Sequence, residues 1–395
     1  MRVLSVTAQK PCSTGSGVYL TEVVRSLAKM GVSQAVVAGV TREDRVDMPE
    51  GVTVYPVYFS SEKLPYPVVG MSDDMPYTST RYRDMTEEMA GQFKAAFLEV
   101  LDEAIEKENP DIILCHHLYY LTALIRAHYP AKKVYGFCHN TDLRQMESIL
   151  FERNFIRQEI PKLDRIFALQ EAQKEKIKKI YPVSEKQMTV IGTGYNSEVF
   201  KKTGIKLSRK DGKIRMIFAG KITQKKGVKS LLRALNLLDY EKEKIQLILA
   251  GGAGNLVEYE EIKELADGCR YPVVFAGCVT QSRLAELYND CDIFVLPSMY
   301  EGLPLTVIES LACGDRVVMT KLEGIAEWLA DMVPDADIRY VLPPGMKGTD
   351  EPLEEELPAF ESRLSKALRE AIEEKDTKEC DVSRISWQKI AREVI

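Results

Sequence analysis

Two glutamates flank a Gly-Pro turn in the stretch YEGLPLTVIE, residues 300–309. Pro304 suits the first turn of a helix, which places Glu301 in the loop before that helix and Glu309 about one and a half turns inside it. Carboxylates in these two positions can face one cleft. An acidic loop residue followed by an ordinary helical glutamate would give the same letters, so the stretch by itself leaves both interpretations open.

A turn with three lysines follows the apolar run IRMIFAG, where the chain reads KITQKKG before a helical pattern. The three are Lys221, Lys225 and Lys226. Positive charge at the start of a helix opposes the helix dipole, whereas a phosphate bound there would be stabilised by the dipole and the lysines together. The turn therefore suggests a phosphate site, with a solvated basic loop as the alternative.

Glycine-rich turns follow several of the apolar runs. The first, STGSG, contains Gly15, Ser16 and Gly17 and opens into a helical pattern, so its backbone N–H groups can approach an anion. It lacks a full GxGxxG pattern and the ending of a P-loop, and a plain tight turn would look alike. Two later turns contain Gly252 and Val279 and suit a nucleoside that lies against the backbone.

Three of the four histidines come at the ends of strand-like runs. His116 and His117 follow DIILC, and His139 follows KKVYGFC. A zinc site would need cysteine or glutamate partners at matched spacing, and none is arranged in that way. We therefore favour hydrogen bonding to a polar ligand, with a structural role as the alternative. The DxD strings at 290–292 and 335–337 precede apolar runs and are interpreted as residues that begin strands, not as metal ligands.

Strand-like and helical patterns alternate along the whole chain, and the alternation starts again after residues 192–212, the expected linker. This predicts an α/β fold with two doubly wound, Rossmann-like domains that face a cleft. Ligands of such sheets bind beyond the carboxyl ends of the strands, which is where the lysines, glycines and histidines above are expected. Residues 60–82, interrupted by prolines and tyrosines, predict a long loop.

The composition narrows the function further. The chain has 395 residues and a formal net charge of −6, which argues against nucleic-acid binding and a strongly basic membrane-binding face. No apolar run reaches the roughly 18 residues of a membrane span, and the apolar part of the first residues is too short for a signal peptide. Eight cysteines without a CxxC pair predict reduced, buried thiols in a cytoplasmic protein.

The second half of the chain resembles the retaining glycosyltransferases of the GT-B fold, family four of the sequence classification. FAGKITQKKGV resembles the family's phosphate-binding turn, and DIFVLPSMYEGLPLTVIESLACG resembles its paired-glutamate segment. In TKLEGIAEWLAD, which resembles a later turn, LEG replaces the usual double glycine. The resemblance implies an acceptor-side domain at 1–200, a donor domain at 201–380, and a helix at 381–395 that crosses back to the first domain.

The resemblance also implies roles for single residues. Lys226 matches the lysine that binds the donor diphosphate, Glu301 the glutamate near the donor sugar, and His139 the histidine near the reacting centre. Glu309 matches the ligand of the nucleotide ribose, and Lys221 stands where the family usually has arginine. The implied donor-binding residues are Gly15, Ser16, Gly17, Lys221, Lys226, Gly252, Val279, Glu301, Gly302, Leu303 and Glu309. The implied acceptor-binding residues are His116, His117, Tyr119 and Asp142.

The implied reaction is the transfer of a sugar, with retention, from a UDP- or GDP-linked donor to a sugar, a lipid-linked acceptor or another small acceptor. Such chemistry belongs to the biosynthesis of glycans, glycolipids or glycoconjugates. No cofactor or metal is expected, because the lysines supply positive charge to the diphosphate. Peripheral association with a membrane stays open.

Four other functions compete with glycosyl transfer. A GT-B relative could act as an epimerase of nucleotide sugars, or serve as a non-catalytic subunit that binds them. Phosphorolysis of the glycogen type would need a pyridoxal lysine motif, which the sequence lacks. An NAD-dependent oxidoreductase is disfavoured because no acidic residue ends the run QAVVAGV, where a ribose ligand belongs.

Overall fold

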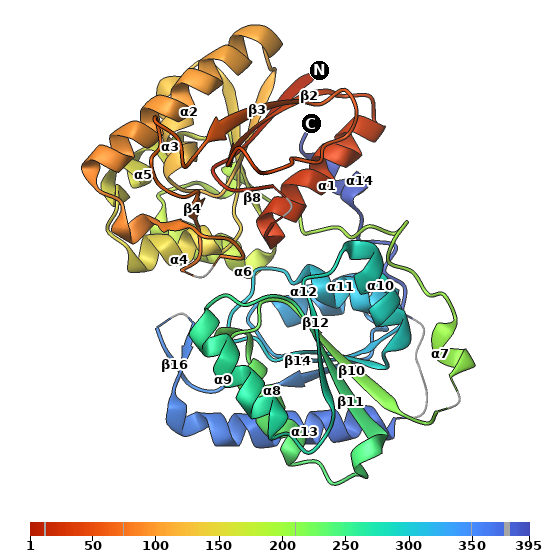
Figure 1. Cartoon of the computed structure of the whole chain (residues 1–395). Coiled ribbons are helices and arrows are strands. Elements are labelled where there is room, and N and C mark those ends of the chain that lie inside the picture. The colour runs from red at the N-terminus through yellow and green to blue at the C-terminus, as the bar shows by residue number, and fades with distance from the viewer. Residues whose placement is uncertain (12, 74, 210, 349, 375–379) are drawn as a thin grey trace. The chain divides into compact units, whose positions relative to one another are not determined.

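The computed structural model describes residues 1–11, 13–73, 75–209, 211–348, 350–374 and 380–395. The chain divides into two compact units, the first made of Met1–Gly194 and Trp387–Ile395 and the second of Tyr195–Ser386. Each unit is built on one large parallel sheet with helices on its faces (Figure 1). The predicted α/β fold with two Rossmann-like sheets is confirmed.

The sheet of the first unit has seven parallel strands in the order β3-β2-β1-β6-β7-β8-β9. Their bounds are β1 Arg2–Thr7, β2 Ser33–Val40, β3 Thr53–Tyr58, β6 Ile112–His116, β7 Lys133–Phe137, β8 Arg165–Ala168 and β9 Met188–Val190. The inner strands β1, β2 and β6 are almost wholly buried, as apolar runs in a sheet covered on both faces should be. The strand order reverses between β1 and β6, and the loops after these strands diverge there.

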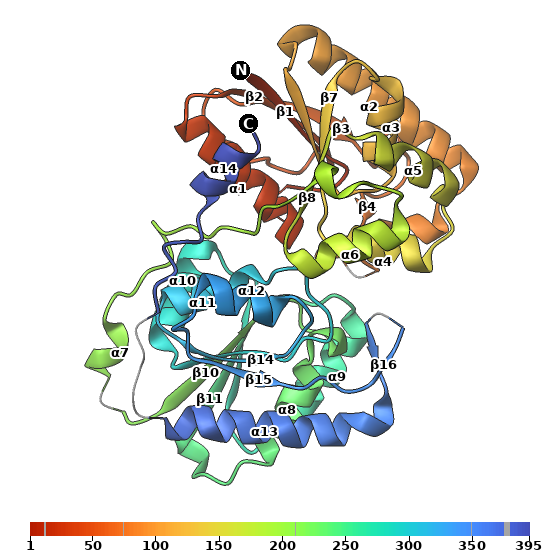
Figure 2. The ribbon, with the colours of Figure 1, turned by 180° about the vertical axis from the view of Figure 1, so that it is seen from behind.

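Helices cover the first sheet on both faces. They are α1 Gly15–Lys29, α2 Glu87–Glu108, α3 Tyr120–His128, α4 Thr141–Ser148, α5 Arg153–Glu159, α6 Glu171–Ile180 and α14 Trp387–Glu393. Figures 1 and 2 both show α14, the last helix of the chain, beside α1. On α2, Phe93, Phe97 and Leu101 are fully buried in the main core.

The predicted long loop at 60–82 is mostly irregular over the described residues 60–73 and 75–82, but these are not a loose loop. Val69–Gly70 (β4) and Thr80–Arg81 (β5) form a short parallel pair. Leu64 and Val68 are fully buried in the core of the unit, and the hydroxyl of Tyr66 donates to the carbonyl of Met89 at 2.7 Å. The segment is therefore packed as a part of the first unit.

The second unit has six parallel strands in the order β12-β11-β10-β13-β14-β15, which reverses between β10 and β13. Their bounds are β10 Ile214–Ala219, β11 Ile245–Ala250, β12 Val273–Gly277, β13 Ile293–Leu296, β14 Arg316–Thr320 and β15 Ile338–Val341. A small antiparallel pair joins β16 Met346–Lys347 and β17 Glu351–Pro352. β10 pairs with both β11 and β13, and the strand order of the sheet reverses between β10 and β13.

The helices of the second unit are α7 Ile205–Ser208, α8 Val228–Asn236, α9 Leu256–Asp267, α10 Gln281–Asp290, α11 Leu305–Ala312, α12 Ile325–Met332 and α13 Leu357–Glu373. Figures 1 and 2 show α8, α9 and α13 on one face of the sheet and α10, α11 and α12 on the other. The short α7 lies inside the segment that the sequence predicted to be a plain linker.

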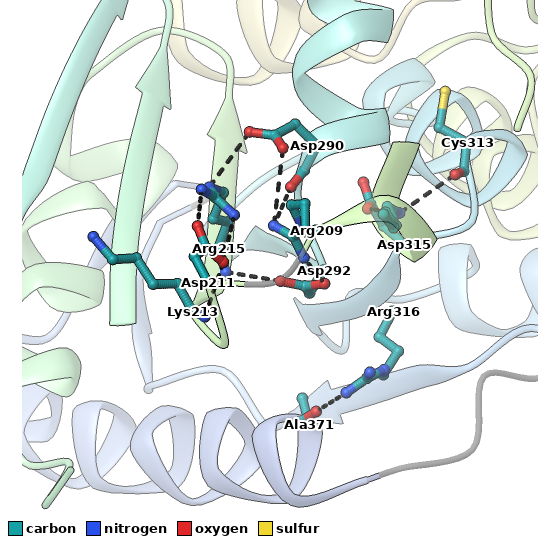
Figure 3. Close-up of polar contacts among 11 residues, drawn as sticks. Arg209, Asp211, Lys213, Arg215, Asp290, Asp292, Cys313, Asp315, Arg316 and Ala371 are labelled. Atoms are coloured by element: carbon teal, nitrogen blue, oxygen red, sulfur yellow. Dashed lines mark hydrogen bonds and ion pairs between the residues drawn. The ribbon is translucent and has the colours of Figure 1, made fainter. Parts of the chain in front are cut away.

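The first DxD string binds arginines at the amino ends of β10 and β13 (Figure 3). The carboxylate of Asp292 accepts the backbone N–H of Arg215 at 2.9 Å and pairs with the guanidinium of Arg209. Asp290 lies 3.4 Å from the guanidinium of Arg215. In the second string, Asp337 pairs with Arg339 at the start of β15. Both strings therefore precede strands, as predicted, at the sheet edge opposite to the loops that follow the strands.

The burial of the thiols agrees with the prediction only in part. Among the described residues the free cysteines are Cys115, Cys138, Cys269, Cys278, Cys291, Cys313 and Cys380. Four of them are buried, at positions 115, 138, 291 and 313. Cys269 and Cys380 are only partly buried, and Cys278, in the turn after β12, is exposed, so the prediction of buried thiols is wrong at these three positions. Cys12 lies outside the described residues. No helix in the described part of the chain is long and apolar enough to cross a membrane.

Candidate functional site

Two charged segments meet where the strand order of the second sheet reverses. One follows β10 and contains Lys226; the other follows β13 and contains Glu301. Nζ of Lys226 lies 2.6 Å from Oε1 of Glu301, and both side chains are largely buried, at 26% and 13% exposure. The lysine turn and the Gly-Pro turn of the sequence thus form one charged site at the carboxyl edge of the sheet.

The backbone holds the two segments together. Gly227 has φ +74°, and a Cβ at this position would lie 2.1 Å from the carbonyl oxygen of Pro297, so only glycine fits without a shift. The N–H of Met299 donates to the carbonyl of Lys225 at 2.9 Å. Thr223 caps the turn by accepting the N–H of Lys226 at 3.3 Å. The position of Lys226 beside the second segment therefore follows from backbone packing as well as charge.

Pro304, at the Gly-Pro turn, is the N-cap of α11 and not part of its first turn, so that prediction is corrected by one position.

The remaining charged residues of the predicted site lie in different surroundings. Glu309 lies inside α11 and is 7% exposed. Lys225 pairs with Asp350 at 2.9 Å. Lys221 directly follows Gly220 at the end of β10.

The glycine turns of the second unit interlock beside the lysine turn. Gly251 has φ +155°, and a Cβ there would lie 1.8 Å from the carbonyl oxygen of Gly220. The N–H of Ile222 donates to the carbonyl of Gly252 at 3.0 Å. Val279, in the turn after β12, is partly buried. These turns bring bare backbone close to the start of the lysine segment, as a nucleotide site requires.

In the first unit, the turn after β1 lies at the reversal of strand order. Gly15 begins α1, and the side chain of Thr14 accepts the N–H of Gly17 at 3.1 Å. The hydroxyl of Ser16 lies 3.1 Å from that of Thr14 and donates to the side-chain oxygen of Gln9 at 3.4 Å. The turn is therefore a capped helix start at the edge where ligands of doubly wound sheets bind.

The three predicted histidines form one cluster. Nδ1 of His116 lies 3.0 Å from Nε2 of His139, and the ring of His117 is 4.9 Å from that of His139. Burial lowers the pKa of His116 to about 3. Burial, with a smaller effect of the other two histidines, lowers the pKa of His139 well below its ordinary value. Both rings are therefore neutral near pH 7 and suited to hydrogen bonding rather than to carrying positive charge.

Asp142 and Tyr119, both predicted on the acceptor side, are buried. The Asp142 carboxylate accepts the backbone N–H groups of Leu118 at 2.7 Å and of His139 at 3.3 Å, and so joins the loop after β6 to the loop after β7. The Tyr119 hydroxyl is buried without a partner among the described residues. Asp142 thus holds the histidine loops in place, and a contact of either residue with an acceptor stays a prediction.

Tyr19 of α1 is a residue of this site that the sequence did not reveal. Its ring centre lies 5.2 Å from that of His139 and 6.1 Å from that of His116, and its hydroxyl donates to the carbonyl of Gly192 at 3.1 Å. Trp387 of α14 packs on its other side. An aromatic residue in an amphipathic helix is ordinarily a core residue, so no signal in the sequence singled it out.

The predicted site residues are thus divided between the units. The glycine turn at 15–17 and the histidines belong to the first unit, and the lysines, Gly252, Val279 and the glutamates belong to the second. Among the residues that the structure describes, no group of three or more His, Cys, Asp or Glu side chains is placed to hold a metal ion.

Two family models together match most of the chain. Residues 13–199 match the model described as Glycosyltransferase Family 4, and residues 200–377 match Glycosyl transferases group 1. An uncharacterized glycosyltransferase of Methanocaldococcus jannaschii is 29% identical over 172 residues, which are 41% of this chain and 44% of that protein. The alpha-maltose-1-phosphate synthase of Mycobacterium tuberculosis is 23% identical over 58% of this chain and 61% of its own length. The matched part therefore spans less than two thirds of these relatives.

Solved structures show the same fold. HepE of Anabaena, in complex with UDP and glucose, has a TM-score of 0.64 and 15% identity, covering 100% of this chain and 98% of that one. The two family models identify the family, and both the fold and the charged segments after β10 and β13 are consistent with it. The chain belongs to the group 1 glycosyltransferases with the GT-B fold.

Proposed function

We propose that the protein is a retaining glycosyltransferase that moves a sugar from a UDP- or GDP-linked donor to an acceptor. The observation that carries the proposal is the pairing of Lys226 with Glu301 at 2.6 Å, where the sheet of the second unit reverses its strand order. The two residues come from the two segments that resemble the donor-binding motifs of the family. A sheet edge of this kind is the usual place for a nucleotide ligand.

The second unit would bind the donor. Lys226 and Lys221 would hold the diphosphate, beside the start of α8 and the exposed backbone of the glycine turns. Glu309, inside α11, would accept hydrogen bonds from the ribose hydroxyls. Glu301, with Gly302 and Leu303, would lie against the donor sugar. Because Glu301 already contacts Lys226, the sugar and the diphosphate would be held by neighbouring charges of opposite sign.

The chemistry follows from where charge develops. As the bond between the sugar and the diphosphate breaks, negative charge grows on the leaving phosphate and positive charge on the sugar ring. Lys226 would stabilise the negative charge on the phosphate, and the carboxylate of Glu301 would stabilise the positive charge on the sugar ring. A preplaced ammonium group can do the electrostatic work of a divalent cation, and we therefore propose that transfer needs no metal ion and no cofactor.

In the first unit, the turn at Gly15, Ser16 and Gly17 would face the diphosphate, and His139 would lie near the reacting centre. The low pKa of His139 favours a neutral ring that makes hydrogen bonds to the substrate. We place the acceptor on this unit, near His116, His117, Tyr119 and Asp142. The chemical nature of the acceptor, whether a free sugar, a lipid-linked sugar or another small molecule, is left open in the proposal.

UDP is the first donor nucleotide to test, because HepE, which shares the fold, was solved with UDP and glucose.

We further propose a cytoplasmic location. The lysine-rich helix α6 does not favour membrane binding: Lys174 and Lys178 both pair with Glu185. An epimerase or a non-catalytic nucleotide-sugar-binding subunit is the alternative function.

The test begins with thermal unfolding of the protein in the presence of UDP- and GDP-sugars. Donors that stabilise the protein are then assayed for hydrolysis and for transfer to simple glycosides, with NMR to show the configuration of the new bond. Release of nucleotide diphosphate with retention supports the proposal. Conversion of the donor into another nucleotide sugar without acceptor would favour an epimerase, and stabilisation without any turnover would favour a binding subunit.

A further inference from the structure

Two histidine rings of the first unit are joined edge to edge. Nδ1 of His116 lies 3.0 Å from Nε2 of His139. The ring planes differ by 13° and the ring centres are 5.2 Å apart, which fits one N–H···N hydrogen bond that lies close to the plane of both rings. Since a neutral imidazole has one protonated and one bare nitrogen, one ring must donate and the other accept.

The surroundings of His116 decide which ring donates. Nε2 of His116 is buried and has no partner among the described residues. If His139 donated, His116 would carry its proton on this Nε2, and an N–H group would be buried without an acceptor. Such orphaned N–H groups are rare because nothing offsets their loss of hydration. If His116 donates from Nδ1, no N–H group is orphaned.

The ring of His116 is also held firmly in place. Phe137 stacks on it with ring centres 4.7 Å apart and planes within 11°, and Tyr19 meets it edge-on at 6.1 Å. Phe137 has no polar side-chain atom and the hydroxyl of Tyr19 donates to the carbonyl of Gly192, so His139 is the partner of Nδ1. The donor of the pair is therefore fixed both in position and in the direction of its N–H group.

We propose that His116 is a positioning residue that fixes His139 as the tautomer with its proton on Nδ1. In this arrangement Nε2 of His139 is occupied by His116, and Nδ1–H is the hydrogen-bond donor that His139 offers to a ligand. No described residue binds that nitrogen, and His139 is only partly buried. The inference rests on the proposed function: at the reacting sugar, His139 donates a hydrogen bond to a substrate oxygen and does not remove a proton.

The tautomers can be read directly by NMR, without an activity assay. The chain has only four histidines, so a long-range ¹H–¹⁵N spectrum of the full protein labelled at histidine is simple to assign. Single substitutions of the four histidines by asparagine identify the signals. We expect a protonated Nδ1 and a bare Nε2 in both His116 and His139, whereas the exposed His128 exchanges between tautomers. A protonated Nε2 in His139 would overturn the proposal.

Kinetics test whether the fixed tautomer matters for transfer. His116→Asn keeps an amide N–H close to the place of Nδ1, and His116→Leu removes the donor. We expect His116→Leu to lower kcat about tenfold with little change in KM for the donor, and His116→Asn to restore most of kcat. His128→Asn is the matched control and should leave kcat unchanged.

The outcomes separate this inference from the proposed function. Equal losses of kcat in His116→Asn and His116→Leu, or none in either, would overturn the positioning role. If no nucleotide sugar is turned over at all, the proposed function fails, while the spectrum of the wild-type protein still decides the tautomer. The same spectrum decides it if His116→Leu does not fold.

Discussion

Lys226 and Glu301 form an ion pair of 2.6 Å although 75 positions separate them in the chain. The contact exists because β10 and β13 are neighbours in the sheet, so that the turns that follow them meet at one edge. A lysine in the first turn and a glutamate in the second are then close enough to pair. In the proposed function, these opposite charges would lie beside the diphosphate and the sugar of the donor.

Removal of the lysine charge should weaken nucleotide binding. We expect Lys226→Met to raise the Kd for UDP or GDP by about tenfold or more, because a charge-assisted hydrogen bond to phosphate contributes about 1.5–3 kcal/mol. Isothermal titration measures the effect, and Lys225→Met, which removes a lysine paired with Asp350, is the matched control. Unchanged affinity in Lys226→Met would place the diphosphate elsewhere.

The two glutamates should give different defects. Glu309→Gln removes the proposed ligand of the ribose, which would act equally in the ground state and the transition state, so we expect a higher KM and weaker nucleotide binding. Glu301→Gln removes the negative charge that we propose lies beside the breaking bond, so we expect a lower kcat with little change in nucleotide affinity. Steady-state kinetics with titration of UDP or GDP separate the two. Near-wild-type behaviour of both variants would mean that Glu301 is an ordinary acidic loop residue and Glu309 an ordinary helical glutamate.

Chelation should leave activity intact. Because the lysines supply the positive charge in the proposed mechanism, we expect transfer to persist in excess EDTA. Activity is compared before and after dialysis against the chelator, with added Mg²⁺ or Mn²⁺ as the control. Complete loss that either ion restores would contradict the metal-free mechanism.

The turns that meet at the strand reversal could be predicted from the sequence, because each strand is a short run of buried apolar residues and ligand groups follow strands. Several helices could not be predicted from the sequence. TDLRQMES of α4 contains only two apolar side chains in eight residues, and its packing depends on tertiary contacts such as the bond from Gln145 to the carbonyl of Met71. The helical pattern of α12 lay in a segment interpreted only as a turn, although Glu327 in its first turn accepts the backbone N–H of the N-cap, Gly324, at 2.9 Å.

The sequence placed His116 and His139 at neighbouring strand ends but could not show their hydrogen bond, because ring orientation depends on Phe137 and Tyr19 around them. The DxD strings show the opposite case. Strand position alone predicted that Asp292 begins a strand, and the structure adds the partners, Arg209 and Arg215, that make its charge tolerable there. The local pattern of residues predicts where a strand begins, whereas the partners of a side chain depend on the three-dimensional fold.

A buried carboxyl at the amino end of β14 should make stability depend on pH. Burial raises the pKa of Asp315 to about 7, although Lys206 pairs with it at 2.6 Å. The folded state thus binds a proton that the unfolded state has released, and stability falls as pH rises from about 4 to about 7. The charged groups around Asp315 are Lys206, Arg209 and Asp292. Between pH 5 and pH 8 we expect wild type to lose on the order of 1–3 kcal/mol relative to Asp315→Asn.

Denaturant unfolding of the two proteins at both pH values measures this difference. Glu260→Gln, which changes an exposed carboxylate of α9, is the control and should leave the pH dependence as in wild type. If the free energies of unfolding of wild type and Asp315→Asn change in parallel between pH 5 and pH 8, Asp315 does not titrate in this range.

Trp387 of the last helix should support the histidine pair through Tyr19. The rings of Trp387 and Tyr19 meet edge-on with centres 4.9 Å apart, Tyr19 in turn contacts His139 at 5.2 Å, and Gly194 leaves no room for a Cβ beside the Trp387 backbone. Trp387→Ala would open a cavity behind Tyr19, and we expect it to cost about 3–5 kcal/mol of stability. Trp387→Phe, which keeps an aromatic ring in the cavity, should lose much less and is the matched variant.

The chain offers a direct probe of this contact. It contains only two tryptophans, so in Trp328→Phe the fluorescence comes from Trp387 alone. Its emission should report a buried ring that becomes exposed on thermal unfolding together with the loss of first-unit structure. Since Tyr19 also borders His139, Trp387→Ala should lower kcat at temperatures where the protein is still folded. Unchanged stability and unchanged kcat in Trp387→Ala would mean that α14 neither stabilises the first unit nor holds Tyr19 against the histidines.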